Sequence, residues 1–379
     1  MQTPAPIMVV STLAYTTEAF LLPYIRHLQE MGYPVEVAAN WKADWNRMPA
    51  DIIRRHFPFT RSLFHPFNLI VLIRLVICLR KTRYAMIYTH TPIASALIRI
   101  AKRLAGSPVP ILYEVHGFHF HQYGNPVMNR IYRWMESFLS GYTRGIITIN
   151  TDDYRQAKQW MHATHIYHSP GIGIDPDYYR PENYDRSRLR REHQIPETLP
   201  VMITIADFIP RKRLDMIIQC AQALSGLEQD FLWIIIGTGP LEQSLTLQIE
   251  QAGLNSMFRL TGWQADIRPW LAMADIFVLL SLQEGLPRSL LEAGLMEIPC
   301  IVSNIRGNRD VVEHTQNSYL VPAENPLQTT SYILELIRNP SSASQMGKNL
   351  RIRICRSFSY AQTLPIHHRI FQECLTFQS

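Results

Sequence analysis

Two successive series of short apolar runs, separated by stretches with helical spacing, constrain the fold more than any other feature of the chain. The first series predicts strands at 7–13, 35–40, 85–90, 109–115 and 145–150. Helices are predicted between them, near 20–31, 67–81, 93–104, 127–139 and 152–161. Continuous apolar strands alternating with helices are typical of a parallel sheet covered on both faces. This half therefore predicts a doubly wound α/β domain.

Residues 169–200 are rich in proline, glycine and charged residues, which is typical of a link between domains. Beyond it the alternation restarts, with strands predicted at 201–208, 231–237, 257–262, 276–281 and 300–303. We expect an N-terminal Rossmann-like domain over 1–175, a second over 176–355, and a C-terminal helix over 356–379 that packs back on the first. Two such α/β domains facing one cleft would present the carboxyl ends of their strands, where open parallel sheets bind ligands.

The composition agrees with a folded globular protein, because 47% of the residues are hydrophobic and 18% are charged. The 5 cysteines are scattered without a close pair, which favours reduced thiols over a disulfide framework. No basic segment opens the chain, so a cleaved signal peptide is not expected. The most apolar stretch, 67–79, is shorter than the ~20 residues of a spanning helix. We expect a cytoplasmic protein, with contact to the inner face of the membrane left open.

The net charge of +6 is concentrated in the first half of the chain. Residues 1–170 carry 18 Lys/Arg and 9 Asp/Glu, a charge of +9, and the remainder carries −3. A membrane surface, a lipid-linked phosphate and nucleic acid are possible anionic partners, and a solvated basic face is the alternative. The helix predicted over 67–81 contains Arg74, Arg80 and Lys81 and is followed by Arg83, which fits either an interfacial helix or a buried helix with a basic end. No nucleic-acid-binding motif is present, so nucleic acid is not an expected partner.

The segment from Glu284 to Glu292 follows the strand predicted at 276–281 and gives the strongest chemical signal. Pro287 is placed where the first helical residue would lie, and a helix beginning there directs its N–H groups and positive dipole end to a ligand. The two carboxylates can each accept hydrogen bonds from sugar hydroxyls. A capping role for Glu284 and an ordinary helical role for Glu292 is the alternative.

This segment, EGLPRSLLEAGLMEIPCIVSNIRGNRDVV, closely resembles the hallmark of retaining glycosyltransferases of family 4, which have the GT-B fold. Further stretches resemble the successive blocks of that family in the same order: HTPIASALIRIAKR, YEVHGFHFHQ, ITINTDDYRQAK, SPGIGIDPDYY, IIGTGPLEQSL and LTGWQADIRPWLAMADIFVLLS. The resemblance covers nearly the whole chain. Its most similar members build bacterial capsule, exopolysaccharide or lipopolysaccharide.

The resemblance implies roles for single residues. Glu292 would bind the ribose, Glu284 the donor sugar, and Lys212 the diphosphate leaving group. His116 would face the donor sugar near its 6-hydroxyl, which makes His116, Lys212 and Glu284 the candidate catalytic residues. The candidate donor-binding set is Asp207, Arg211, Gly237, Thr238, Gly239, Gln264, Glu284, Gly285, Leu286, Pro287, Arg288, Ser289 and Glu292.

The chain departs from the family pattern at two places. Asp207 stands where relatives carry an arginine, so Arg211, Arg213 or the helix terminus would have to hold more of the phosphate charge. The usual Gly-Gly turn after the first strand is missing, and the equivalent segment contains Thr16 and Thr17.

Two groups of residues in the sequence could be taken for metal sites. His116, His119 and His121 could be ligands, but no cysteine or glutamate cluster accompanies them. Asp175 and Asp177 form a DxD pattern inside the interdomain link, where we do not place a metal site. No metal or cofactor is expected.

The predicted function is transfer of a hexose or N-acetylhexosamine from a nucleotide diphosphate donor, most simply UDP-linked, to a lipid-linked or polysaccharide acceptor with retention of configuration. The alternatives are a nucleotide-sugar epimerase or a phosphorylase of the same fold, and a non-catalytic subunit that binds nucleotide-sugar.

Overall fold

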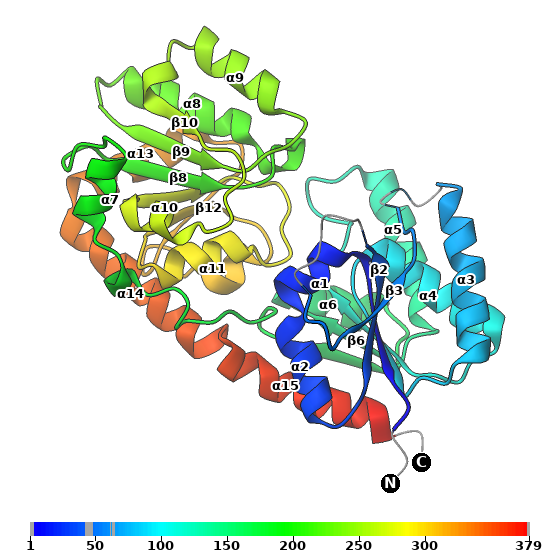
Figure 1. Ribbon diagram of the computed structural model, residues 1–379. Coiled ribbons are helices and arrows are strands. Elements are labelled where there is room, and N and C mark those ends of the chain that lie inside the picture. The colour runs from blue at the N-terminus through cyan, green and yellow to red at the C-terminus, as the bar shows by residue number, and fades with distance from the viewer. Residues whose placement is uncertain (1–3, 42–47, 61, 63–64, 377–379) are drawn as a thin grey trace. The chain divides into compact units, whose positions relative to one another are not determined.

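The computed structural model describes residues 4–41, 48–60, 62 and 65–376. The chain divides into two compact units: the first comprises residues 1–173 together with 360–379, and the second comprises 174–359. Each unit is built around its own parallel sheet (Figure 1). The prediction of two doubly wound α/β domains is confirmed.

The first unit holds a 7-stranded sheet in the order β3-β2-β1-β4-β5-β6-β7. Its strands are β1 (Ile7–Leu13), β2 (Val35–Asn40), β3 (Ile53–His56), β4 (Met86–Thr89), β5 (Ile111–Val115), β6 (Gly145–Thr148) and β7 (His165–His168). Its helices are α1 (Ala14–Phe20), α2 (Leu22–Glu30), α3 (Phe67–Lys81), α4 (Pro92–Ala105), α5 (Pro126–Ser140), α6 (Thr151–Trp160) and α15 (Tyr360–Leu375). All of the strand pairs are parallel.

Side chains of β1 alternate between two apolar layers, as the period of 2 in a strand requires. Ile7 and Val9 pack in one buried cluster with residues of α2 and α15. Met8 and Val10 pack in another with residues of α3 and α4. The sheet is therefore buried on both faces, which explains why its central strands are continuously apolar.

The helix predicted over 20–31 is α2, and a further helix that was not predicted, α1, precedes it and meets it at Leu21. Pro23 stands in the first turn of α2, where its missing N–H is tolerated, whereas inside one continuous helix its ring would clash with the preceding turn. Strand β1 runs directly into α1, and the buried Thr17 places its Oγ1 2.8 Å from Ser11 Oγ. The segment without the Gly-Gly turn is thus a helix start.

The second unit holds a 6-stranded parallel sheet in the order β10-β9-β8-β11-β12-β13. Its strands are β8 (Val201–Ile205), β9 (Leu232–Ile236), β10 (Phe258–Leu260), β11 (Ile276–Leu279), β12 (Cys300–Ser303) and β13 (Tyr319–Val321). Its helices are α7 (Arg186–Glu192), α8 (Leu214–Ser225), α9 (Glu242–Gln251), α10 (Arg268–Met273), α11 (Arg288–Leu295), α12 (Asn308–Val311), α13 (Pro326–Arg338) and α14 (Pro340–Ser357), with short 3₁₀ turns at Pro181–Asn183, Pro210–Lys212 and Asn255–Met257.

The strand order reverses between β8 and β11 in the second unit, because β9 and β10 lie to one side of β8 and β11 to β13 to the other. Such a switch point leaves the loops after the two central strands free to diverge, and it is where open α/β sheets bind ligands. The loop after β8 carries Lys212 and the loop after β11 carries Glu284. In the first unit the equivalent reversal lies between β1 and β4.

No helix among the described residues is long and apolar enough to cross a bilayer.

Candidate active site

The loops after β8, β9, β10 and β11 are joined to one another at the carboxyl edge of the second sheet. The N–H of Phe208 donates to the carbonyl of Thr238 (2.9 Å), and the N–H of Gly237 donates to the carbonyl of Gly262 (3.0 Å). The N–H of Leu282 donates to the carbonyl of Arg211 (2.8 Å) across the switch point. Residues from four separate stretches of sequence therefore share one edge of the sheet.

Lys212 and Glu284 form an ion pair across this switch point. Lys212 Nζ lies 2.6 Å from Glu284 Oε1, and the side chains of both are largely buried. Arg211 adds a second cation, with Nη1 3.7 Å from Glu284 Oε2 and 3.0 Å from the carbonyl oxygen of Gln283. A buried carboxylate is tolerated when cations accompany it, and here two do.

The charge state of Glu284 follows from these neighbours. Burial alone would raise the pKa of this carboxyl, but Lys212 and Arg211 outweigh burial and lower the pKa below its ordinary value. Glu284 is therefore ionised near neutral pH, and it holds the ammonium of Lys212 at the strand ends.

Lys212 lies on the 3₁₀ turn Pro210–Lys212, ahead of α8, which begins at Leu214. Arg213 separates the two with a left-handed backbone (φ 50°), which interrupts the helical hydrogen bonding. Arg213 also pairs with Asp215 (3.0 Å) and Glu324 (3.2 Å). The guanidinium of Arg213 is thus paired with these two carboxylates, and Arg211 is the arginine that lies beside Glu284.

Helix α11 begins at Arg288, one residue later than predicted, and Pro287 is the residue that precedes its first turn. Pro287 has an extended ψ of 121°, so it closes the loop instead of opening the helix. The first bonds of the helix run from the N–H groups of Leu290 and Leu291 to the carbonyl of Pro287. The N–H groups in the first turn of an α-helix have no intrahelical partners. In α11 these groups lie next to Gly285 and Leu286, which precede the helix in the chain.

Glu292 lies in the middle of α11 and is buried. Its Oε1 accepts a hydrogen bond from the hydroxyl of Tyr179 (2.7 Å) and another from Arg288 Nε (2.9 Å). Sequence reasoning missed Tyr179 as a partner, because it lies 113 residues away in the chain. The carboxylate is held in one orientation, as a binding residue requires.

The glycines of the turn after β9 have a packing requirement. A Cβ at Gly237, whose φ is +147°, would lie 2.0 Å from the carbonyl oxygen of Ala206, and one at Gly239 would lie 2.6 Å from that of Phe208. Thr238 between them is exposed. The two glycines let the loops after β8 and β9 come into contact, which places Asp207 on the exposed side of that contact.

The remaining predicted donor-binding residues lie at the same edge. Gln264 is half-buried, and its Nε2 donates to the carbonyl of Thr261 (2.9 Å) in the loop after β10. Ser289 is half-buried in the first turn of α11. The second unit thus gathers every predicted donor-binding residue on the loops that follow β8 to β11 and on α11.

Two residues that sequence reasoning did not single out hold the Glu284 loop from the far side. Arg306 Nε donates to the carbonyl of Glu284 (3.2 Å). Gly307 has a φ of +77°, and a Cβ there would lie 2.2 Å from the carbonyl oxygen of Gly285. The Arg-Gly pair inside the stretch EGLPRSLLEAGLMEIPCIVSNIRGNRDVV was the signal that could have identified them.

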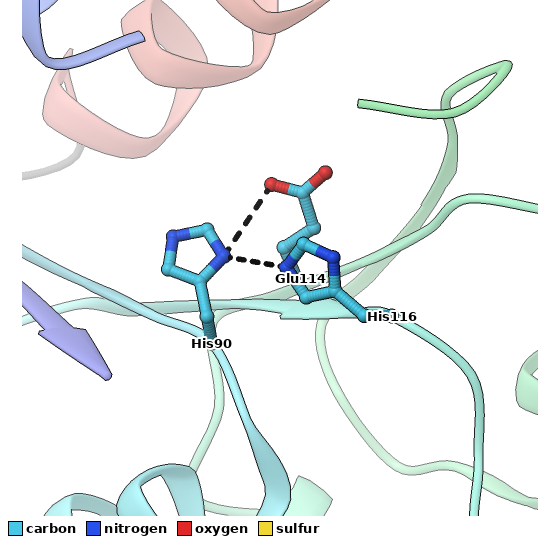
Figure 2. A group of neighbouring side chains, drawn as sticks. All are labelled: His90, Glu114 and His116. Atoms are coloured by element: carbon cyan, nitrogen blue, oxygen red, sulfur yellow. Dashed lines mark hydrogen bonds and ion pairs between the residues drawn. The ribbon is translucent and has the colours of Figure 1, made fainter. Parts of the chain in front are cut away.

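His116 in the first unit follows β5 and belongs to a cluster with His90, which follows β4, and Glu114 (Figure 2). His90 Nδ1 lies 3.0 Å from His116 Nε2 and 3.7 Å from Glu114 Oε2. Burial lowers the pKa of His90 to about 3 and also lowers that of His116, so both rings are neutral near pH 7.

The partners of His90 fix the direction of this bond. Because Glu114 Oε2 lies on the Nδ1 side, the proton of His90 is favoured on Nδ1, from which it is donated to His116 Nε2. His116 then carries its own proton on Nδ1. In this arrangement His116 Nδ1 is a hydrogen-bond donor.

Glu114 is fully buried on β5, and its carboxylate has partners on the C-terminal helix α15 and on β4. His367 of α15 donates through Nδ1 to the carbonyl of Thr363 (2.9 Å), and its Nε2 lies 3.4 Å from Glu114 Oε1. The hydroxyl of Tyr88 donates to Glu114 Oε2. Burial would raise the pKa of Glu114, but His367, His116 and His90 outweigh burial and lower it to about 2.

His90, Glu114 and His116 are also the group of possible metal ligands among the described residues, with their ligand atoms within 4.8 Å of one another. This group differs from the sequence-based candidates His116, His119 and His121. His119 is exposed and packs edge-on against Tyr132, with ring centroids 5.7 Å apart. The His90–His116 hydrogen bond already uses the nitrogens that would face an ion.

Comparison with known proteins gives matches along both halves of the chain. Residues 185–353 match the family model described as glycosyl transferases group 1, and residues 17–165 match the model described as a glycosyl transferase 4-like domain. The putative glycosyltransferase EpsD of Bacillus subtilis is 30% identical over 364 residues, covering 94% of each chain.

A second relative is a UDP-Gal:alpha-D-GlcNAc-diphosphoundecaprenol alpha-1,3-galactosyltransferase of Escherichia coli, 29% identical over 76% of this chain and 75% of its own. Among solved structures, Anabaena HepE in complex with UDP superposes with a TM-score of 0.79 at 17% identity, covering 97% of this chain and 100% of its own. The likeness to HepE confirms the predicted GT-B fold.

Proposed function

The chain belongs to the group 1 glycosyltransferases, and from this premise we propose that it transfers a hexose or N-acetylhexosamine from a UDP-linked donor to a lipid-linked acceptor, with retention of configuration, in cell-surface polysaccharide synthesis. The observation that carries the proposal is the Lys212–Glu284 ion pair at the switch point of the second sheet. Loss of a diphosphate builds negative charge on the leaving group. A cation held in place before the reaction stabilises that charge without further reorganisation.

In this proposal the second unit binds the donor. Lys212, Arg211 and the first turn of α11 receive the diphosphate, because these groups supply positive charge and backbone donors at adjacent strand ends. The other carboxylate oxygen of Glu284 accepts hydroxyl groups of the sugar. Glu292, oriented by Tyr179 and Arg288, accepts hydroxyl groups of the ribose.

The first unit supplies His116, to which we assign a hydrogen bond to the transferred sugar. The tautomer favoured by His90 presents an N–H on His116, which suits donation to a sugar oxygen and not removal of a proton. A covalent carboxylate intermediate is not part of the proposal, since Glu284 is engaged with Lys212 and no second carboxylate is assigned to the sugar. Substitution on one face of the sugar, assisted by the departing phosphate, gives retention.

The choice of donor and acceptor rests on the relatives. The name of the Escherichia coli relative specifies a UDP-sugar, an alpha linkage and a diphosphoundecaprenol acceptor. HepE was crystallised with UDP. We therefore assign UDP as the nucleotide and a polyprenyl diphosphate-linked sugar as the acceptor. No metal ion takes part in the proposed reaction, because Lys212, Arg211 and the start of α11 supply the stabilising charge.

The proposal is tested by incubating the purified chain with a panel of UDP- and GDP-sugars, with and without a lipid extract that contains polyprenyl diphosphate sugars, and measuring nucleotide release. We expect release with a UDP-sugar only when the lipid acceptor is present. Conversion of the donor without any acceptor would identify an epimerase. Donor binding without release under every condition would identify a non-catalytic subunit.

A further inference from the structure

Helix α3 exposes an apolar face in addition to the one it buries. Its inner side packs Val71, Leu75 and Leu79 against the sheet. The opposite side exposes large apolar side chains at helical spacing, namely Phe67, Leu69, Ile70, Ile73 and Ile77. A helix of an ordinary globular surface would carry polar residues on that side.

Helix α5 shows the same feature. Val127, Ile131, Trp134 and Phe138 recur at spacings of four, three and four residues, which places them along one side of the helix. All four are exposed, Trp134 by 67%, and the rings of Trp134 and Phe138 stack with centroids 5.9 Å apart. Met128 is exposed beside them.

The two helices belong to one layer of the first unit, on either side of α4 (Figure 1). Arg80 of α3 donates to the carbonyl of Leu104 in α4 (3.1 Å). The buried Arg99 of α4 pairs with Glu136 of α5 (2.9 Å). The exposed apolar residues of α3 and α5 therefore face outward from the same side of the sheet, with the exposed Leu104 between them. We call these residues the α3–α5 face.

The charge around this face has one sign. Between Asp51 and Glu114 the sequence has no acidic residue, but it has ten basic ones: Arg54, Arg55, Arg61, Arg74, Arg80, Lys81, Arg83, Arg99, Lys102 and Arg103. Arg74, Arg80 and Lys81 are exposed on α3, and Arg103 and Arg130 are exposed on α4 and α5. The helices α3, α4 and α5 themselves contain one acidic residue, Glu136, which pairs with Arg99. The α3–α5 face is therefore apolar and bordered by cations.

We propose that the α3–α5 face docks on a lipid bilayer that contains anionic lipids, with the apolar side chains entering the interfacial region and the basic side chains contacting headgroup phosphates. Such pairing of apolar and basic side chains is the physical signature of interfacial binding. Aromatic side chains such as Trp134 are favoured at that depth. The inference goes beyond the transfer reaction, and it stands or falls independently of that reaction.

A second copy of the chain is a poorer occupant. A two-fold interface on this face would bring the basic border of one copy against the same border of the other, and like charges in contact oppose association. An anionic bilayer instead neutralises the whole border at once. The charge of the face thus selects between the two occupants.

The test measures co-sedimentation of the full chain with vesicles of phosphatidylcholine alone and of phosphatidylcholine with phosphatidylglycerol, in the absence of nucleotide-sugar. We expect binding to the anionic vesicles, weakened by salt. The double variants Ile73→Ser/Ile77→Ser and Trp134→Ser/Phe138→Ser should each lose binding by tenfold or more. Lys81→Gln/Arg83→Gln should lose about fivefold per basic residue.

Leu247→Ser/Leu327→Ser is the matched control, because these leucines are exposed by 55% and 73% on α9 and α13 of the second unit. This control should bind like the unaltered chain, and circular dichroism should show that every variant is folded. Absence of binding to anionic vesicles at low salt would overturn the proposal. Binding of the α3 and α5 variants that equals that of the unaltered chain would overturn it as well. Concentration-dependent dimerisation lost in the α3 or α5 variants, without vesicle binding, would assign the face to self-association.

Discussion

Lys212 Nζ lies 2.6 Å from Glu284 Oε1, so an ion pair joins the loops that follow the two central strands of the second sheet. The pair is largely buried, so each partner should contribute to stability as well as to the role proposed for it. Removing Lys212 leaves the buried carboxylate of Glu284 with only the more distant Arg211, whereas removing both charges of the pair leaves no buried carboxylate to be compensated. This difference allows stability and catalysis to be separated by experiment.

Lys212→Gln is expected to lower kcat by about 10²–10³, because the leaving diphosphate loses its positioned cation. The same variant should lower the melting temperature, since Glu284 is left without its closest partner. The double variant Lys212→Gln/Glu284→Gln should recover most of the stability without recovering turnover. Melting curves and nucleotide release are the two measurements, and a double variant with restored turnover would refute the assigned role of Lys212.

Glu292→Gln is expected to weaken UDP binding by about tenfold or more, because a hydrogen bond to a charged acceptor is stronger than one to a neutral amide. Tyr179→Phe is the matched control: it removes the hydroxyl that donates to Glu292 and leaves the carboxylate in place. Calorimetric titration with UDP should show a smaller loss for the control. Equal affinity of Glu292→Gln and the unaltered chain would remove Glu292 from the nucleotide site.

Gly307→Ala should impair donor binding by at least tenfold, because the added Cβ would meet the carbonyl of Gly285 at 2.2 Å and displace the loop beside Glu284. Gly253→Ala is a strict control for backbone strain, since its φ of +71° is similar but nothing lies within 4 Å of its Cβ position. Both variants should lose about 1–2 kcal/mol of stability from the left-handed backbone. If the two variants bound UDP equally well, the contact with Gly285 would have no part in holding the site.

Stability should fall as the pH drops below about 6.5, because the unfolded chain protonates His90 there while the folded chain does so only near its pKa of about 3. His90 faces Glu114, His116 and His367, and the lowered pKa values of His116 and Glu114 act in the same direction. Each group adds a slope of up to about 1.4 kcal/mol per pH unit within its own window.

Urea unfolding between pH 7 and pH 4 measures this dependence. His90→Asn keeps a polar side chain and removes one titrating ring, so its slope below pH 6.5 should be smaller. An unchanged slope would mean that His90 is not the group that resists protonation.

The sequence predicted the central strands of both sheets to within a few residues, since these strands are buried on both faces and are continuously apolar. The strands it missed, β3, β7 and β13, all lie at sheet edges. The four residues of β3, Ile-Arg-Arg-His, are mostly exposed, and those of β7 are partly so. An edge strand has fewer apolar neighbours, so no apolar run reveals β3 or β7, whereas β13 is apolar but only three residues long.

The candidate site was predictable where a motif was continuous and was missed where its partners came from elsewhere in the chain. The stretch from Glu284 to Glu292 could be interpreted from sequence together with Lys212. Tyr179 and His90 could not, because only the fold brings Tyr179 to Glu292 and His90 to His116. The exact start of α11 was also misplaced, because proline is accepted both before and inside a first turn.

The most direct measurement of the central claim follows a labelled sugar from its UDP donor into the lipid fraction while UDP release is counted, with EDTA present throughout. We predict one sugar transferred per UDP released, turnover unaffected by EDTA, and loss of both signals in Lys212→Gln. UDP release without label in the lipid, or transfer that stops when EDTA removes divalent cations, would contradict the proposed metal-independent transfer.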